Sequence, residues 1–296
     1  MNDIKIFKRE LSIEETNLNI LSDVDINSNF DNNNINSNSN DNSNNNKIIN
    51  KKVNDDYNKN YNKGNNLDEF IINQRNQIKE YMVNNPLFAK TMKPYKIKNS
   101  ENTSEIPKVI KLMINGSKIA NVGPTATLAG TIAELSLDYL IKNGSNYSII
   151  DNGGDIAFLN NYNKEKIVFG IYAGNSPLSG KIGFEFKFKK KDQKFGACSS
   201  SASVGYSISY GRSDCVTIIA NQASLADGLA TSIANNVNGK KDEDAVENGL
   251  NAAEQYKENF IGALIIVGET VGTIGKLPKI IETQNIGINK DFEDKI

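Results

Sequence analysis

The chain of 296 residues contains no histidine, and this absence excludes several kinds of catalytic site. Ser-His-Asp and Cys-His hydrolases need an imidazole as general base, so neither class is possible here. Zinc sites that use histidine are excluded for the same reason, and two cysteines are too few for an all-cysteine site. We therefore expect any bound metal to be a hard ion such as Mg²⁺, held by oxygen ligands.

The chain also has few cysteines and almost no net charge, and both facts indicate where the protein works. Cys198 and Cys215 are the only cysteines, which argues against a disulfide framework and fits a reducing compartment. The net charge is −1, so no basic surplus points to nucleic acid or to an anionic membrane. No apolar run approaches the roughly 18 residues of a membrane span, and the first ten residues lack the apolar core of a secretory signal. We expect a cytoplasmic protein with no nucleic-acid or membrane partner.

One segment near the amino terminus is poor in apolar residues. Residues 25–66 are nearly half asparagine, with Asp, Ser and Lys between. Such a segment has too little apolar surface to offset the entropy cost of ordering, so we expect it to be disordered. Residues 1–24 alternate apolar and polar side chains and predict a β-hairpin. We interpret residues 25–66 as an insertion within one domain. Its composition favours an expansion without function over a binding tail.

Residues 67–281 have the pattern of one globular domain, followed by a tail over residues 282–296. Apolar residues at helical spacing predict helices over residues 67–85, 109–114, 124–143 and 225–237. Strands are predicted at residues 147–150, 156–159, 167–172, 182–188 and 214–220, with a last hairpin over residues 263–274. Strands outnumber helices, and several adjoin through tight turns. The predicted fold is therefore α+β, a single domain with largely antiparallel sheet layers and helices.

One predicted helix carries a candidate metal site. Asp227 and Thr231 are four residues apart in the helix over residues 225–237, so they share a face. A carboxylate and a hydroxyl on one face suit a hard cation. A second interpretation also fits, in which Ser224 is the N-cap and Asp227 completes a capping box. The spacing alone favours the cap.

Two glycine-containing turns are candidate ligand loops. Paired glycines at Gly153 and Gly154 let a ligand approach the backbone, and Asp155 can accept hydrogen bonds from a base or ribose. A plain hairpin turn explains the same residues equally well. Gly123 and Thr125 open a helix, where free N–H groups bind phosphate. No phosphate-loop motif is present, so an ordinary helix start is favoured there.

Residues 195–211 are rich in glycine and serine and predict a ligand-lining loop that includes Ser199 and Ser200. Within it, Cys198 is either a reactive thiol or an unreactive small residue, and the absence of histidine favours the latter. Arg212 and Asp214 are expected to pair with a ligand or with each other.

Five motifs in order resemble one family. They are NVGPTATLAGTIAEL, IIDNGGDIA, GIYAGNSPLSGKIG, CSSSASVGYSISYGRSDCVTIIA and ASLADGLATSIANNV. Together they resemble uncharacterised protein family 0280, an archaeal and bacterial family in the ApbE-like superfamily. The similarity covers about residues 107–278, and the first hairpin and helix also resemble the start of the family. The Asn-rich insertion is foreign to that pattern.

The best-known members of this superfamily are flavin transferases, which move FMN from FAD onto a protein threonine with Mg²⁺. The resemblance implies Asp227 and Thr231 as metal ligands, and Gly153, Gly154 and Asp155 beside a flavin nucleotide. It therefore implies an ApbE-like fold and a small-molecule ligand, either FAD or another nucleotide.

The chain also departs from the flavin transferases. They carry a histidine before the metal helix, which is absent here, and a lysine that is replaced around residues 127–129. These departures argue against FMN transfer. Two other interpretations stay open: an enzyme or accessory factor in anaerobic sulfur or cofactor metabolism that uses Cys198, and a non-catalytic scaffold. The sequence is compatible with a homo-oligomer.

Overall fold

The computed structural model describes residues 4–26, 66–98, 102–162, 166–188, 190–201 and 211–283. Most of the predicted disordered insertion, residues 27–65, lies outside the described residues, as does most of the predicted tail. The two ends of the insertion are part of the fold. Ile26 is fully buried, and the Asn66 side chain accepts a hydrogen bond from the backbone N–H of Glu69 and so caps helix α2 (Leu67–Asn84). The predicted insertion is therefore too long at both ends.

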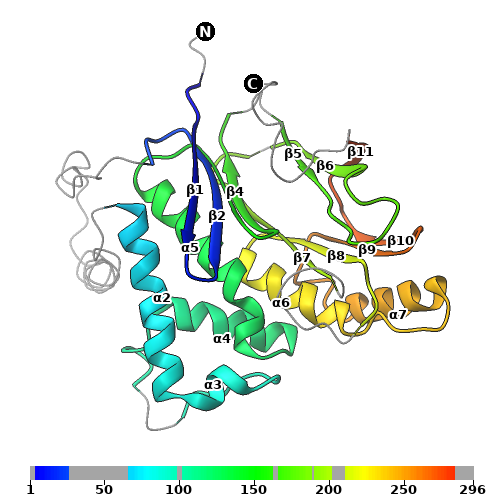
Figure 1. Cartoon of the computed structure of the whole chain (residues 1–296), viewed down its shortest axis with the longest axis horizontal. Helices are drawn as coiled ribbons and strands as arrows, with labels where there is room; N and C mark the ends of the chain where they lie inside the picture. Colours follow the sequence, from blue (N-terminus) through cyan, green and yellow to red (C-terminus); the bar gives the residue numbers. More distant parts are fainter. Residues whose placement is uncertain are drawn as a thin grey trace, which may run out of the picture.

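Eight strands form the main sheet, in the order β1-β2-β3-β4-β7-β8-β9-β10 (Figure 1). Their bounds are β1 Phe7–Ile13, β2 Thr16–Ser22, β3 Tyr147–Asn152, β4 Asp155–Asn160, β7 Lys194–Ser200, β8 Cys215–Ala220, β9 Gly262–Val267 and β10 Thr270–Gly275. Every neighbouring pair is antiparallel. Because β2 pairs with β3, the amino-terminal hairpin extends the same sheet as the rest of the chain. The predicted α+β class with antiparallel sheets is confirmed.

The main sheet separates two apolar layers. Successive residues of a strand point to opposite faces, so Ile149 and Ile150 of β3 enter different cores. Helices cover one face: α5 (Leu128–Lys142) contacts β3 and β4, α6 (Ala223–Ala234) contacts β7 and β8, and α7 (Asp242–Glu254) contacts β9 and β10. None of the helices in the described ranges has the length and apolarity needed to cross a membrane.

A smaller antiparallel sheet packs against the other face, in the order β11-β6-β5. Its strands are β5 Ile167–Gly170, β6 Ile182–Phe186 and β11 Lys279–Glu282. Phe158 of the main sheet lies edge-on to Phe169 and Phe186 of the smaller one, with ring centroids 4.9 and 4.8 Å away. These aromatic contacts join the two sheets.

Several predicted boundaries are wrong. Helix α4 (Lys108–Ala120) continues through the predicted loop and ends at Asn121, whose φ is 56°. Residues 195–200 lie in the strand β7, because pairing with β4 and β8 on both sides outweighs the glycine and serine content. Helix α3 (Pro86–Lys90), the helix α7 and the strand β11 were not predicted, and a short 3₁₀ helix, η1 (Pro124–Thr127), precedes α5.

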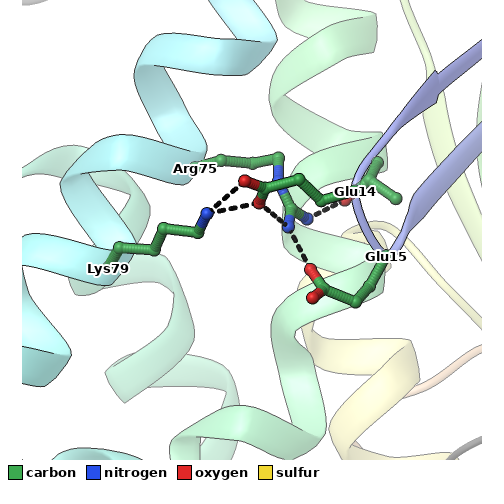
Figure 2. Close-up of polar contacts among 5 residues, drawn as sticks. Glu14, Glu15, Arg75 and Lys79 are labelled. Atoms are coloured by element: carbon green, nitrogen blue, oxygen red, sulfur yellow. Dashed lines mark hydrogen bonds and ion pairs between the residues drawn. The ribbon is translucent and has the colours of Figure 1, made fainter.

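A buried arginine fastens the first hairpin to helix α2, as Figure 2 shows. The guanidinium of Arg75 donates to the Thr16 hydroxyl and pairs with Glu14 at 2.7 Å and with Glu15. Lys79 pairs with Glu14 from the next turn of the helix. Hydrogen bonds from Lys79 and then Arg75 lower the pKa of the Glu14 carboxyl. This network joins the strands before the Asn-rich segment to the helix after it.

Replacing Arg75 by alanine should destabilise the fold by about 1–3 kcal/mol, because the buried Thr16 hydroxyl loses its donor. The matched control is Lys79→Ala in the same network, which removes a half-exposed surface pair and should leave stability unchanged within error. Urea unfolding of both variants measures the difference. Equal stability of the two variants would show that the buried arginine does not hold the hairpin.

Candidate functional site

Where helices α5 and α6 meet, a carboxylate of each helix accepts a hydrogen bond from the backbone of the other. Oδ2 of Asp227, on α6, accepts a hydrogen bond from the backbone N–H of Gly130 in the first turn of α5, at 2.8 Å. Oε2 of Glu134, on α5, accepts from the backbone N–H of Ser224 at 3.0 Å and from its hydroxyl at 2.7 Å. Each carboxylate therefore satisfies an otherwise free N–H group at the amino terminus of the other helix.

This arrangement overturns the predicted capping role of Ser224 and Asp227. Helix α6 starts two residues earlier than predicted, with Gln222 at the N-cap position and no side-chain cap. Ser224 therefore lies inside the helix and bonds to Glu134, and Asp227 reaches across to α5. The capping interpretation is wrong because the partners are about 90 residues away in sequence, beyond the reach of local spacing.

The close approach of these helices depends on glycine. A Cβ atom on Gly130 would lie 2.4 Å from the carbonyl oxygen of Ala223 and 2.7 Å from Cβ of Asp227. Gly116 of α4 and Gly228 of α6 are equally crowded, each with a neighbouring atom 2.8 Å from the added Cβ. Side chains at these positions would push the helices apart, so the glycines fix where Asp227 sits.

The predicted shared face of Asp227 and Thr231 is confirmed. The ten other residues of α6 are buried, and these two alone are partly exposed. Asp227 and Thr231 therefore form the open stripe of an otherwise enclosed helix.

A second carboxylate lies close to Asp227. Asp155 is the first residue of β4 and pairs with Cys198 of β7. Burial, followed by the negative charge of Asp227, raises the pKa of Asp155 well above its ordinary value. Burial also raises the pKa of Asp227 to about 7, against the opposing effect of the Gly130 hydrogen bond. Two carboxylates held close together resist being charged at the same time.

One oxygen of this pair has no partner. Oδ1 of Asp155 is buried and receives no hydrogen bond. A buried carboxylate oxygen without a donor, next to another carboxylate, is an environment that a cation satisfies. Among the described residues no group of three or more Asp, Glu or Cys side chains forms a metal cluster. A cation here would need further oxygens from hydroxyls, the backbone or its ligand.

The predicted glycine turn is a tight hairpin turn. Gly153 and Gly154 join β3 to β4 with φ angles of 67° and 98°, which favour glycine. The backbone N–H of Gly154 donates to Oδ1 of Asp151 at 2.8 Å. A Cβ atom on either glycine would meet nothing within 4 Å, so the space beside the turn is open. The turn brings this open backbone next to Asp155.

A cavity of about 360 Å³ lies beside the other end of α6. It brings together the predicted residues Gly123, Thr125 and Thr231. Gly123 has a structural role as well, because a Cβ atom there would lie 1.9 Å from the carbonyl oxygen of Thr91. Asp155, Gly153 and Gly154 do not line this cavity, so Thr231 links it to the carboxylate pair one turn away.

The predicted ligand-lining loop is wrong for Ser199 and Ser200, which lie on the strand β7. Neither residue lines the cavity. The Ser199 hydroxyl is 2.8 Å from the Thr217 hydroxyl on the adjacent strand. Cys198 is fully buried, its thiol donates to the carbonyl of Ala223 at 3.3 Å, and burial raises the pKa of the thiol well above its ordinary value. These facts favour an unreactive cysteine.

Arg212 and Asp214 do not pair with each other. Arg212 pairs with Asp242 at 2.5 Å, and Oδ2 of Asp214 accepts from the backbone N–H of Gly268 at 2.7 Å. Arg212 and Asp214 therefore make structural contacts, with the start of α7 and with the end of β9.

A protein-family model described as AbpE bacteria matches residues 55–274. The chain is 46% identical over 224 residues to a UPF0280 protein of Methanobrevibacter smithii, covering 76% of this chain and 90% of the relative. It is 44% identical over 230 residues to a UPF0280 protein of Methanothermobacter thermautotrophicus, covering 78% and 85%. This chain belongs to the UPF0280 family. The predicted family resemblance is confirmed.

Solved ApbE structures show a looser similarity to this UPF0280 chain. One of them is described as a flavin transferase. ApbE from Vibrio cholerae is 15% identical, with a TM-score of 0.39, and the match covers 95% of this chain and 98% of that one. The ApbE protein from Thermotoga maritima is 12% identical, with a TM-score of 0.42, covering 95% and 97%.

Sequence reasoning missed Gly130, which donates to Asp227, and Glu134, which accepts from Ser224. Both lie in the motif AGTIAEL, where a glutamate interrupts an apolar helix, and that interruption was the available signal. It also missed Gln255 and Tyr256, which line the cavity from the turn after α7. No local signal marked those two residues.

Gly130→Ala should destabilise the protein by about 1–3 kcal/mol, although alanine normally favours a helix, because the new methyl group overlaps Ala223 and Asp227. Gly170→Ala is the matched control, since a Cβ atom there meets nothing within 4 Å, and it should change stability by less than about 1 kcal/mol. Chemical denaturation decides between them. A Gly130 variant as stable as the Gly170 variant would contradict the close helix contact.

Proposed function

We propose that this UPF0280 protein binds a nucleotide or flavin together with Mg²⁺, at the meeting point of α5, α6 and the β3–β4 turn. The observation that carries the proposal is the pair Asp155 and Asp227, with a buried oxygen that lacks a partner, one helical turn from a hydroxyl that lines a cavity.

Asp227, Thr231 and Asp155 would hold the cation. When bound, Mg²⁺ would neutralise the two carboxylates and the phosphate oxygens of the ligand. The hydrogen bond from Gly130 keeps Asp227 oriented, and the open backbone at Gly153 and Gly154 leaves room for a ligand beside Asp155. The resemblance of the ADGLAT and GGD motifs to those of the flavin transferases supports this assignment.

We propose binding without FMN transfer. The chain has no histidine, and the lysine of the flavin transferases is replaced near residues 127–129. The alternative that uses Cys198 as a sulfur-handling group has no support, since the thiol is buried and its pKa is raised. A cytoplasmic small-molecule-binding protein, compatible with a homo-oligomer, is the setting that we propose for this activity.

Wild-type protein should gain about 2.7 kcal/mol of stability with Mg²⁺ and FAD or ADP at about one hundred times the Kd. Asp227→Asn should abolish the Mg²⁺-dependent gain, because the charged metal ligand is lost. Without ligand, this variant should be at least as stable as wild type at pH 8, because the raised pKa of Asp227 means that folding disfavours its charged form. Thermal melts with and without Mg²⁺ and nucleotide measure both effects.

Asp138→Asn is the matched control, as Asp138 is a partly buried carboxylate on α5 that pairs with Lys108 and Lys194 and lies away from the site. It should lower stability yet keep the ligand-induced gain. An unchanged gain in Asp227→Asn would mean that the metal assignment is wrong. No gain in wild type with any nucleotide would favour the scaffold interpretation.

A further inference from the structure

The cavity beside Thr231 has no charged side chain in its lining. Its polar groups are hydroxyls and side-chain amides, from Thr125, Thr231 and Ser232 and from Asn121, Asn235, Asn236 and Gln255. Tyr256 and a few apolar side chains, among them Met92, complete the wall. None of the lining residues is Asp, Glu, Lys or Arg.

An anion would be poorly held in such a cavity. Phosphate sites in proteins supply a cation or free helix N–H groups, and an anion taken from water without them carries a large desolvation cost. The lining therefore offers no charged side chain to support the predicted phosphate-binding role of Gly123 and Thr125. Neutral amides and hydroxyls instead match the donors and acceptors of an uncharged heterocycle or hydroxylated chain.

Helix α6 connects the two chemically different ends of the site. Asp227, Thr231 and the C-cap residue Asn235 recur every four residues, and all three are partly exposed. At 1.5 Å per residue, Asp227 and Asn235 are separated by about 12 Å along the helix. The carboxylate pair thus lies at the first turn of α6, and the uncharged cavity lies at its last turn.

We infer that the cavity takes the uncharged part of a nucleotide-class ligand, a base, flavin ring or sugar chain, while its phosphates stay with the cation at Asp227. This inference rests on the proposed function for the phosphate end alone. Binding of the uncharged part should be independent of Mg²⁺, and binding of the phosphates should require it.

The test divides FAD into its parts: riboflavin, adenosine and pyrophosphate, each titrated into the full chain by calorimetry with and without Mg²⁺. We expect pyrophosphate to bind only with Mg²⁺, and riboflavin or adenosine to bind equally well in its absence. Thr125→Lys places a cation at an exposed position of the cavity. This variant should weaken binding of the uncharged fragment at least about tenfold, which corresponds to about 1.4 kcal/mol. Its affinity for pyrophosphate should be unchanged.

Thr273→Lys, at an exposed position on β10 outside the cavity, is the matched control and should change neither affinity. Asn236→Lys, a second exposed lining position, repeats the test if Thr125→Lys does not fold. Tighter pyrophosphate binding by either cavity variant would overturn the inference, as would failure of both uncharged fragments to bind wild type. If the uncharged fragments bind but pyrophosphate with Mg²⁺ does not, the proposed function fails and the assignment of the cavity stands.

Discussion

The position of the site depends on how closely α5 approaches α6 at Gly130. With no side chain there, the carbonyl of Ala223 and Cβ of Asp227 fit against the first turn of α5. This close approach lets Asp227 accept a hydrogen bond from the backbone of α5, and Glu134 accept one from the backbone of α6. Helix-terminal N–H groups and the helix dipoles stabilise both carboxylates. The same contact brings Asp227 near Asp155, at the end of the β3–β4 turn.

The carboxylates of Asp155 and Asp227 destabilise the folded state when both are charged. Burial raises the pKa of both carboxyls, and the charge of Asp227 raises the pKa of Asp155 further, so folding favours the protonated forms. A carboxyl whose pKa is raised by folding contributes stability to the folded state while it is protonated. For Asp227 this contribution is fully present below the pKa of the unfolded chain, near 4. It is lost as the pH rises through the pKa of the folded state, about 7. Above that pH a cation would relieve the repulsion. Perturbed carboxylates beside an open turn and a cavity are typical of functional sites.

Periodicity in the sequence predicted the parts of the fold that local pattern controls. The helices α5 and α6 and the β3–β4 hairpin follow from apolar spacing and paired glycines, and the shared face of Asp227 and Thr231 follows from helical geometry. Contacts between distant segments were not predictable in this way. Asp227 bonds to a residue 97 positions away, and the glycine- and serine-rich residues 195–200 became a strand because two neighbours pair with them. The cavity lining from the turn after α7 likewise required the tertiary structure.

If Asp155 and Asp227 hold one cation between them, Asp155→Asn should weaken the binding of that cation. Calorimetric titration of Mg²⁺ would compare wild type, Asp155→Asn, Asp227→Asn and the double variant. Each single variant should weaken Mg²⁺ binding at least about tenfold. The double variant should lose little more, because residues that act as one unit are not additive. Wild-type Mg²⁺ affinity in Asp155→Asn would mean that the two carboxylates do not share a cation.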